Sequence, residues 1–385
     1  MYIWQQTDWP RLHIQESALA GSIALARHEQ GKAIGLIRAI GVPRMDEVTR
    51  DIWINEAVAT AAIEGEKIDM GSVRSSVMRR LGMHGESGAP ASRSVDGLLD
   101  VMEDATHAYP DVLSDDRLYR WQSALFPGGA SGIRRITVGK YRITREPMQI
   151  VSGPVGREKV HYEAPKSSVV AKEMRRLLAW FEQTKPRAVT PSKMDGIVRA
   201  AIAHLWFETV HPFEDGNGRV GRAIVDLALA QDAGTSQRIY SMSRQLMRER
   251  DAYYRQLSEA QRGTLDVTAW VTWFIAQFCR ACIASQEVIS GALDKNRFWA
   301  THSAHSLNAR QRKALTRMLD AGNGGFEGGM SAEKYGHFTG ASKATATRDL
   351  VDLEHAGLLL VTGQGRATRY WVNVPGWTIG EPDAN

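Results

Sequence analysis

The residues best suited to chemistry lie in one stretch of twelve, which reads His-Pro-Phe-Glu-Asp-Gly-Asn-Gly-Arg-Val-Gly-Arg and starts at His211. His211 could take a proton from an incoming hydroxyl as a general base. Asp215 is the kind of hard carboxylate that binds Mg2+ beside phosphate oxygens. Arg219 and Arg222 lie three residues apart, so they can share one face of a helical turn and bind an anion together. These residue types predict a site that handles phosphate.

Two helices must position this stretch. Apolar residues recur at helical spacing across residues 194–210 and stop at His211, because a residue before proline is biased away from the α region. A second apolar pattern follows Gly216, Asn217 and Gly218, so we expect a helix to begin near Gly218 with its unpaired amides facing the loop. The alternative is an ordinary helix connection with a core histidine and arginines that pair with nearby acids. The convergence of so many titratable and anion-binding groups favours a site.

The same stretch resembles the signature of the Fic (Fido) family, His-x-Phe-x-(Asp/Glu)-Gly-Asn-Gly-Arg-x-x-Arg, at every defining position. The resemblance implies transfer of AMP from ATP to a hydroxyl side chain of a target protein, on Tyr, Thr or Ser, with release of pyrophosphate and with Mg2+ as the cofactor. It also implies a mainly α fold, made of a helical Fic core and a β-hairpin flap. Related proteins often form dimers, so a homodimer is one option for the assembly.

The roles that the resemblance implies fall on the matching positions. His211 is the catalytic base, Asp215 is the Mg2+ ligand, and Phe213 anchors the loop in the core. The residues that would hold the nucleotide phosphates are Gly216, Asn217, Gly218, Arg219 and Arg222. Glu214 lies at a variable position of the signature and has no implied role.

A second motif lies upstream, at the end of an apolar helical pattern over residues 48–63. Thr60-Ala-Ala-Ile-Glu64-Gly65 matches the family's inhibitory motif (Ser/Thr)-x-x-x-Glu-(Gly/Asn). A carboxylate paired with Arg222 would occupy the space and charge that the ATP γ-phosphate needs, and Thr60 lies one helical turn before Glu64. The resemblance therefore implies that Glu64 and Thr60 inhibit the enzyme, whereas composition alone fits a core helix that ends in a solvated acid.

Short β-type runs at residues 133–138, 148–151 and 160–162, separated by glycine-rich turns, predict a β-hairpin. Such a hairpin could be structural cover. The resemblance implies instead a flap over residues 149–162, which would hold the target peptide by strand addition. Farther along the chain, Tyr253 and Tyr254 could line an adenine site or could simply pack in the core.

The composition is that of an ordinary globular protein, with a formal charge of +5 from 48 basic and 43 acidic residues. The first residues show no secretory signal, and no apolar run reaches the length of a membrane span, so we expect a cytosolic protein with no membrane partner. Cys279 and Cys282 are too few for a disulfide framework and are expected to be core thiols. Trp4 and Trp9 are expected to pack on the main domain.

At 385 residues the chain is too long for one ordinary domain. We expect an N-terminal helical region over residues 1–94 with the inhibitory helix, a Fic catalytic domain over 95–290, a linker over 291–306 and a separate domain over 307–385. Three helical patterns and a hairpin in the last domain resemble a winged helix-turn-helix, with Ser342 as the cap of its recognition helix. The residues expected to face outward are Lys343, Thr345, Thr347 and Arg348 on this helix and Arg366 and Arg369 on the wing.

The charge of this last domain leaves its partner open. From residue 301 onward nine basic residues stand against eight acidic ones, whereas DNA-binding domains normally carry a basic excess. The domain could therefore dock a protein, dimerise or bind DNA.

The leading interpretation is an ATP- and Mg2+-dependent protein adenylyltransferase that Glu64 holds inactive. One alternative is a winged-helix transcription regulator whose Fic domain only senses nucleotide. Another is a Fic enzyme that removes AMP or transfers a different phosphate-containing group. His211, Asp215, Arg219 and Arg222 all fit the AMP-transferring pattern, so the signature itself favours the leading interpretation.

Overall fold

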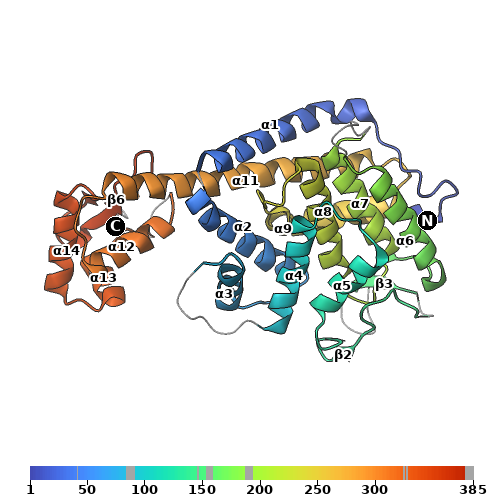
Figure 1. Cartoon of the computed structure of the whole chain (residues 1–385), viewed down its shortest axis with the longest axis horizontal. Coiled ribbons are helices and arrows are strands. Elements are labelled where there is room, and N and C mark those ends of the chain that lie inside the picture. The colour runs from blue at the N-terminus through green and yellow to red at the C-terminus, as the bar shows by residue number, and fades with distance from the viewer. Residues whose placement is uncertain are drawn as a thin grey trace. The chain divides into compact units, whose positions relative to one another are not determined.

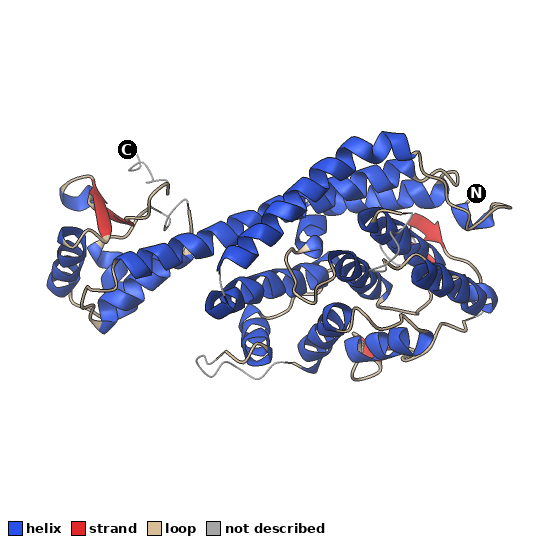
Figure 2. Ribbon diagram, turned by 45° about the horizontal axis from the view of Figure 1, so that its top comes forward, coloured by secondary structure: helices blue, strands red, loops and turns tan. Residues whose placement is uncertain are grey.

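The computed structural model describes residues 1–40, 42–83, 92–144, 147–152, 159–186, 194–323, 326 and 328–377. The chain divides into two compact units, Met1–Gln286 and Glu287–Asn385. Helices make up most of both units, and the strands that the structure describes occur only in short pairs (Figure 2). The prediction of a mainly α fold is therefore confirmed.

The first unit consists of helices that Figure 1 labels along the chain. Their bounds are η1 Ile3–Gln5, α1 Glu16–Ile40, α2 Val42–Ile63, α3 Met70–Arg80, α4 Arg93–His107, α5 Asp115–Leu125, α6 Ser167–Gln183, α7 Gly196–Val210, α8 Asn217–Ala233, α9 Met242–Arg248 and α10 Arg250–Arg262. A further helix, α11 (Thr268–Thr301), begins in the first unit and continues into the second. The helices predicted over residues 48–63 and 194–210 are thus confirmed.

The centre of the first unit is α7, whose fifteen residues are all buried. A helix that is apolar on every side belongs inside a helical core, and α7 packs against α6 and α8. Helix α8 in turn contacts α4 and α5. Figure 1 shows α7 and α8 surrounded by the other helices of this unit. The end of α7 and the start of α8 therefore lie on a rigid, well-packed scaffold.

The middle of helix α2 is bound to the region around α9. Its Glu56 is 1% exposed and accepts hydrogen bonds from the Ser241 hydroxyl at 2.7 Å and the Ser243 amide at 3.0 Å. The guanidinium of Arg238 lies 3.9 Å from the same carboxylate. These contacts hold the middle of α2 in place two helical turns before Glu64.

The tryptophans of the N-terminal segment and the cysteines of α11 pack in the first unit, as predicted. Trp9 donates its indole N–H to Glu173 at 2.8 Å, and Trp4 donates to the carbonyl of Glu163 at 2.9 Å. Cys279 and Cys282 are free and buried. Burial raises the pKa of both thiols, so neither is a reactive thiolate.

Two separate hairpins take the place of the hairpin predicted across residues 133–162. Strands β1 (Ala130–Ser131) and β2 (Arg134–Arg135) pair around a tight turn, and β3 (Gln149–Ser152) pairs antiparallel with β4 (Lys159–Glu163). The strand expected over residues 133–138 is shortened to β2, because Ile133 sits exposed in the turn and the Thr137 amide bonds to Glu214 instead of to a strand. The expected flap over residues 149–162 coincides with β3 and β4, although its residues 153–158 lie outside the described part.

The second unit contains three helices followed by a hairpin. Their bounds are α12 Ala309–Asp320, α13 Ala332–Thr339, α14 Lys343–His355, β5 Leu359–Thr362, η2 Gly365–Ala367 and β6 Arg369–Val372. The three predicted helical patterns are confirmed, and each helix begins at a side-chain cap, provided by Asn308, Ser331 and Ser342. The range 291–306 was expected to be a linker, but α11 is helical through Thr301, because Phe298 belongs to the buried core of this unit.

No helix in the described ranges combines the length and the apolar character that crossing a bilayer requires.

Candidate active site

The loop between α7 and α8 places a strained histidine at the end of the central helix. His211 ends α7 in the left-handed region, with φ 48° and ψ 62°, and its amide donates to the Phe207 carbonyl at 2.9 Å. Among the described residues it is the only one besides glycines with a positive φ. Such a conformation costs roughly 1–2 kcal/mol, so the surrounding contacts must hold it.

Arg142 holds this backbone from outside the signature. Its Nε donates to the His211 carbonyl at 2.8 Å. Its Nη2 donates to the carbonyls of Pro165 at 2.5 Å and Val210 at 3.2 Å. The side chain is 1% exposed, and burial lowers the pKa of Arg142 to about 10, which still leaves it charged at neutral pH. A cation suits this position because the carbonyl end of α7 carries partial negative charge.

Phe213 and Asn217 close the loop on itself. Phe213 is fully buried, and its ring packs near Tyr141 and Phe207. The Asn217 side chain accepts a hydrogen bond from the Phe213 amide and donates one to the Phe213 carbonyl, both at 2.9 Å. Glu214, which had no implied role, accepts a hydrogen bond from the Thr137 amide at 3.1 Å and so ties the loop to the segment after β2.

The predicted anion site is the first turn of α8. The helix begins at Asn217, and Gly216 precedes it with φ 85°, a conformation that favours glycine. One oxygen of Asp215 accepts the Gly216 amide at 2.6 Å. In the described part of the chain no three His, Cys, Asp or Glu side chains gather as a metal site. A lone carboxylate such as Asp215 fits Mg2+ that takes most of its ligands from phosphate and water.

The carboxylate of Glu64, the residue directly after α2, lies at this predicted anion site. Glu64 lies 2.9 Å from the Arg222 guanidinium, and a Cβ built on Gly218 would lie only 2.2 Å from its Oε1. Arg222 also donates to the Thr60 hydroxyl at 2.7 Å and to the Thr60 carbonyl at 2.9 Å. Burial alone would lower the pKa of Arg222, but the charge of Glu64 outweighs it, so the pKa is raised. The guanidinium is charged, and Thr60 and Glu64 engage its Nε and Nη2, whereas its buried Nη1 has no hydrogen-bond partner among the described residues.

The other arginine of the signature is occupied as well. Arg219 lies 3.0 Å from Glu66, two residues after Glu64, and its guanidinium stacks 4.8 Å from the centre of the Phe126 ring. Glu66 was not predicted as a site residue, because a single acid after a helix end carries no pattern of its own. One short segment after α2 thus supplies an acid to each arginine.

Glu208 faces the histidine from one turn earlier on α7. Its Oε2 lies 3.7 Å from His211 Nδ1, and both side chains are nearly buried. Burial would raise the pKa of Glu208, but its interactions with His211 and His204 outweigh burial and lower it. The carboxylate therefore stays ionised and faces Nδ1, so that Nε2 is the nitrogen left for a substrate proton.

The tyrosines considered for an adenine site serve other contacts. Tyr253 is 2% exposed, and its hydroxyl pairs with His204 Nε2 at 2.8 Å. Tyr254 donates to the carbonyl of Ile63, the last residue of α2, at 3.2 Å, and Arg250 donates to the same carbonyl at 3.0 Å. The packing alternative thus describes Tyr253, and Tyr254 holds the end of α2, directly before Glu64.

The predicted site residues all lie on three neighbouring pieces of the chain, which are the end of α2 with the residue after it, the loop after α7 and the first turns of α8. Sequence patterns pointed to His211 and Arg222 directly. They missed Arg142, Glu66 and Glu208, whose importance depends on contacts that no short motif encodes.

Comparisons with known proteins bear on this geometry. Residues 112–229 match the family model described as Fic/DOC family, and residues 2–83 match a domain of unknown function, DUF4172. A protein of Aquifex aeolicus (strain VF5) named "Probable protein adenylyltransferase" is 29% identical over 106 residues. That alignment covers 28% of this chain and 28% of the relative, so it compares little more than a quarter of each protein.

Solved structures resemble the fold over longer stretches. A Fic family protein from Desulfovibrio desulfuricans G20 has a TM-score of 0.51 and 22% identity, covering 93% of this chain and 97% of that chain. A Fic domain containing signaling protein from Bacteroides thetaiotaomicron VPI-5482 has a TM-score of 0.51 and 16% identity, covering 68% of this chain and 97% of that chain. At these identities the likeness concerns the fold.

Proposed function

Because the chain carries a Fic/DOC domain, with its signature on the loop between α7 and α8, we propose that it transfers AMP from ATP to a hydroxyl side chain of a target protein. One observation carries the proposal. The Glu64 carboxylate is seated against Arg222 and within van der Waals reach of Gly218, so an anion already occupies the place where a triphosphate would bind. Amides at a helix start together with guanidiniums are the groups that bind phosphate.

In the proposed reaction His211 Nε2 takes the proton of the acceptor hydroxyl, whose oxygen attacks the α-phosphorus of ATP. The bond between that phosphorus and the bridging oxygen to the β-phosphate breaks, and pyrophosphate leaves. Glu208 faces Nδ1 with its ionised carboxylate 3.7 Å away, and that charge would stabilise the imidazolium that forms. Mg2+, held through Asp215 and the phosphates, would neutralise the charge on the leaving group.

We further propose that the described state is inhibited. Arg222 cannot bind the γ-phosphate while Glu64 and Thr60 engage its guanidinium, so nucleotide could bind only in an unproductive way. Activation then requires Glu64 to leave. The β3–β4 hairpin is the proposed flap, which would present the acceptor segment as an added strand.

The test uses three versions of the protein, namely wild type, Glu64→Gly and His211→Ala, with α-labelled or γ-labelled ATP, Mg2+ and a cell lysate as the source of acceptors. The proposal predicts protein-bound label from the α position alone, strongest in Glu64→Gly and absent in His211→Ala. Label from the γ position would mean a kinase-like reaction. Either that result or no labelling in any version would overturn the proposal.

A further inference from the structure

We propose that the C-terminal unit binds double-stranded DNA through the N-terminal half of α14 and the turn of the β5–β6 hairpin. The proposal is independent of the AMP transfer, because it uses other residues in the other unit. It rests on the arrangement of α13 and α14, on the two faces of α14 and on where the charges of this unit lie.

Helices α13 and α14 are joined as in a helix-turn-helix. Only three residues separate them, and Gly340, with φ 74°, makes the turn that ends α13. Ser342 then caps α14 by accepting the Thr345 amide. The hairpin follows directly, with β5 packed on α14 and β6 paired antiparallel to β5. Figure 1 shows α12, α13, α14 and β6 gathered in this unit.

Helix α14 has one buried face and one exposed face. Ala346, Leu350 and Leu353 are buried in the core of the unit. Lys343 and Thr347, one turn apart, are exposed, as are Ala344 and Arg348 on the next row. The N-terminal half, residues 343–348, reads Lys-Ala-Thr-Ala-Thr-Arg and holds no apolar side chain larger than alanine.

This composition favours DNA over a protein partner. A protein interface normally has an apolar or aromatic centre, which the exposed row of α14 lacks. A helix with small and hydroxyl side chains fits the major groove, where Thr can contact a thymine methyl and Arg can bond a guanine edge. In helix-turn-helix proteins the N-terminal residues of the second helix make these contacts.

The charge count of this part of the chain does not show where its charges lie, because two of its acids are held in ion pairs. Asp349 is 5% exposed and binds Arg310 at 2.9 Å and the Tyr335 hydroxyl at 2.8 Å. Asp320 lies 3.0 Å from Lys295. The near balance of nine basic and eight acidic residues is therefore a poor guide to the field above α14.

The cations of the proposed surface are uncommitted within the described part of the unit. Lys343, Arg348 and Arg366 are exposed, and the ion pairs in that part of the chain involve other residues. Arg366 lies at the hairpin turn. Arg369 was expected to face outward, but it is partly buried and donates to the carbonyls of Arg366 and Thr368, so it braces the turn. Thr345 is likewise only half exposed.

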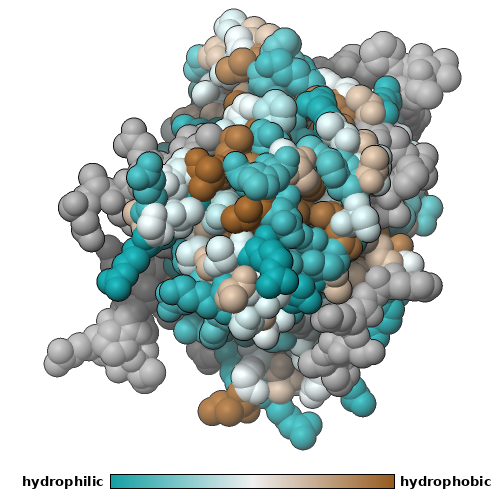
Figure 3. Space-filling model, turned by 90° about the vertical axis from the view of Figure 1, so that its left-hand side faces the viewer, coloured by the Kyte–Doolittle hydropathy of each residue, from teal (hydrophilic) through white to brown (hydrophobic). Residues whose placement is uncertain are grey.

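The acids of α14 lie toward its other end. Asp352 is exposed, and Glu354 lies 3.6 Å from His355 in the last turn. A helix that is basic at its start and acidic at its end would enter a groove with its N-terminal half. Figure 3 shows one face of the molecule, on which hydrophilic and hydrophobic side chains are interspersed.

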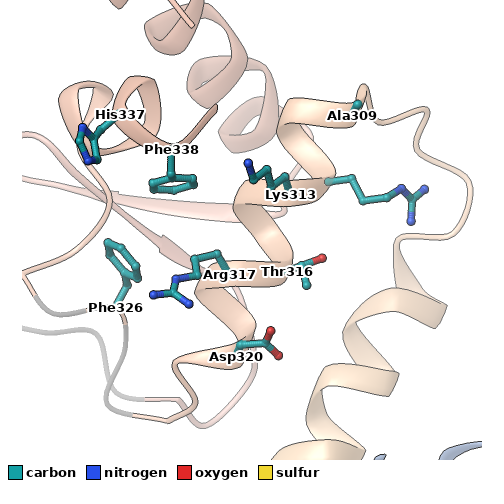
Figure 4. Close-up of a pocket in the computed structure, with 9 residues that line it drawn as sticks. Ala309, Lys313, Thr316, Arg317, Asp320, Phe326, His337 and Phe338 are labelled. Atoms are coloured by element: carbon teal, nitrogen blue, oxygen red, sulfur yellow. The ribbon is translucent and has the colours of Figure 1, made fainter. Parts of the chain in front are cut away.

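A second group of cations supplies the matched control. Lys313 and Arg317 point from α12 toward Phe338 and Phe326, in a pocket whose lining comes from α12, α13 and Phe326 (Figure 4). No residue that lines this pocket belongs to α14 or to the hairpin. Removing these two charges changes the net charge of the unit as much as removing Lys343 and Arg348.

The experiment measures fluorescence anisotropy of a labelled 30-base-pair duplex with the full chain between about 50 and 200 mM salt. Wild type and His211→Ala should bind equally, with affinity that falls steeply as salt rises. The double variant Lys343→Ala/Arg348→Ala should reduce the slope of log affinity against log salt by about 2, and each lost phosphate contact should cost about eightfold in affinity near 0.1 M salt. Lys313→Ala/Arg317→Ala should keep the wild-type slope.

Three results would overturn the proposal. One is no binding of the duplex by wild type at low salt. Another is an equal loss in both double variants, which would mean unspecific attraction to a positive protein. The third is wild-type DNA binding by Lys343→Ala/Arg348→Ala together with a changed molecular mass in light scattering, which would identify the surface of α14 as a contact between copies of this chain.

Discussion

Replacing Glu64 tests whether the acid in the anion site restrains the enzyme. The variant Glu64→Gln keeps the size of the side chain and removes its charge, and Glu64→Gly removes both. In the structure the nitrogen–oxygen distance to Arg222 is 2.9 Å, with Arg222 only 3% and Glu64 30% exposed. The contact is therefore largely shielded from water, and it is a charge-assisted hydrogen bond and not a surface ion pair.

The size of the effect follows from the strength of that contact. A hydrogen bond between charged groups contributes roughly 1.5–3 kcal/mol net. Its loss should raise the population with a free Arg222 about 10- to 150-fold, since 1.4 kcal/mol corresponds to a factor of ten. We expect the initial rate of protein labelling from α-labelled ATP to rise by that factor in Glu64→Gly and by less in Glu64→Gln, whose amide can still accept from the guanidinium.

The assay compares initial rates at fixed ATP, Mg2+ and lysate, with His211→Ala as the control for background labelling. Thermal unfolding of each variant shows whether α2 stays folded, because Thr60 still holds Arg222 through two hydrogen bonds. The proposed inhibition by Glu64 would be refuted if folded Glu64→Gly labels protein at an initial rate within threefold of wild type. This conclusion requires that the labelling depend on His211.

Three further predictions follow from contacts of the first unit. Glu66→Gln should raise the labelling rate less than Glu64→Gly does, because Glu66 is 45% exposed where it meets Arg219; a rise as large as that of Glu64→Gly would contradict this. Arg142→Ala should lower kcat at least tenfold and the melting temperature by several degrees, since it leaves buried carbonyls unpaired at about 1–3 kcal/mol each, and Arg142→Lys should recover little. Gly97→Ala should lower the free energy of unfolding, measured by urea titration, by more than about 2 kcal/mol, because a Cβ would lie 1.9 Å from the Ala124 carbonyl oxygen. Gly21→Ala in α1 is the control: a Cβ there would meet nothing within 4 Å, so the free energy of unfolding should be unchanged or rise by up to about 1 kcal/mol.

The parts of the site that sequence could predict are those that a short segment contains. The break at His211 and the helix start after Gly216 follow from proline and glycine chemistry, and both are observed. The sequence also predicted that Thr60 and Glu64 lie one helical turn apart. The family resemblance implied the pairing of Glu64 with Arg222, but nothing in the sequence indicated the pairing of Glu66 with Arg219, because that contact joins residues 153 positions apart.

The misses have the same physical origin. Arg142 looks like an ordinary surface cation in the sequence, and only the fold brings it under the carbonyl end of α7. A count of charges treats Asp349 as equal to Asp352, although the first is paired in the core and the second is exposed. Helix α11 extends to Thr301 because Phe298 packs in the core of the second unit, a contact that the sequence does not show.

The contacts of α2 also indicate how much structure must change to free Arg222. Glu56 is bound deep in the protein at 1% exposure, Thr60 is 3% exposed, and the Glu64 side chain is 30% exposed, so the helix is held less tightly toward its end. The last turn is fixed mainly through the Ile63 carbonyl, which Arg250 and the Tyr254 hydroxyl bind. Displacing that turn breaks the part-buried hydrogen bonds to the Ile63 carbonyl and the two buried ones between Arg222 and Thr60, whereas removing the whole helix would also expose the Glu56 carboxylate and its apolar neighbours. The free energy needed to release Arg222 is therefore set by the contacts of the final turn of α2, including those with α10.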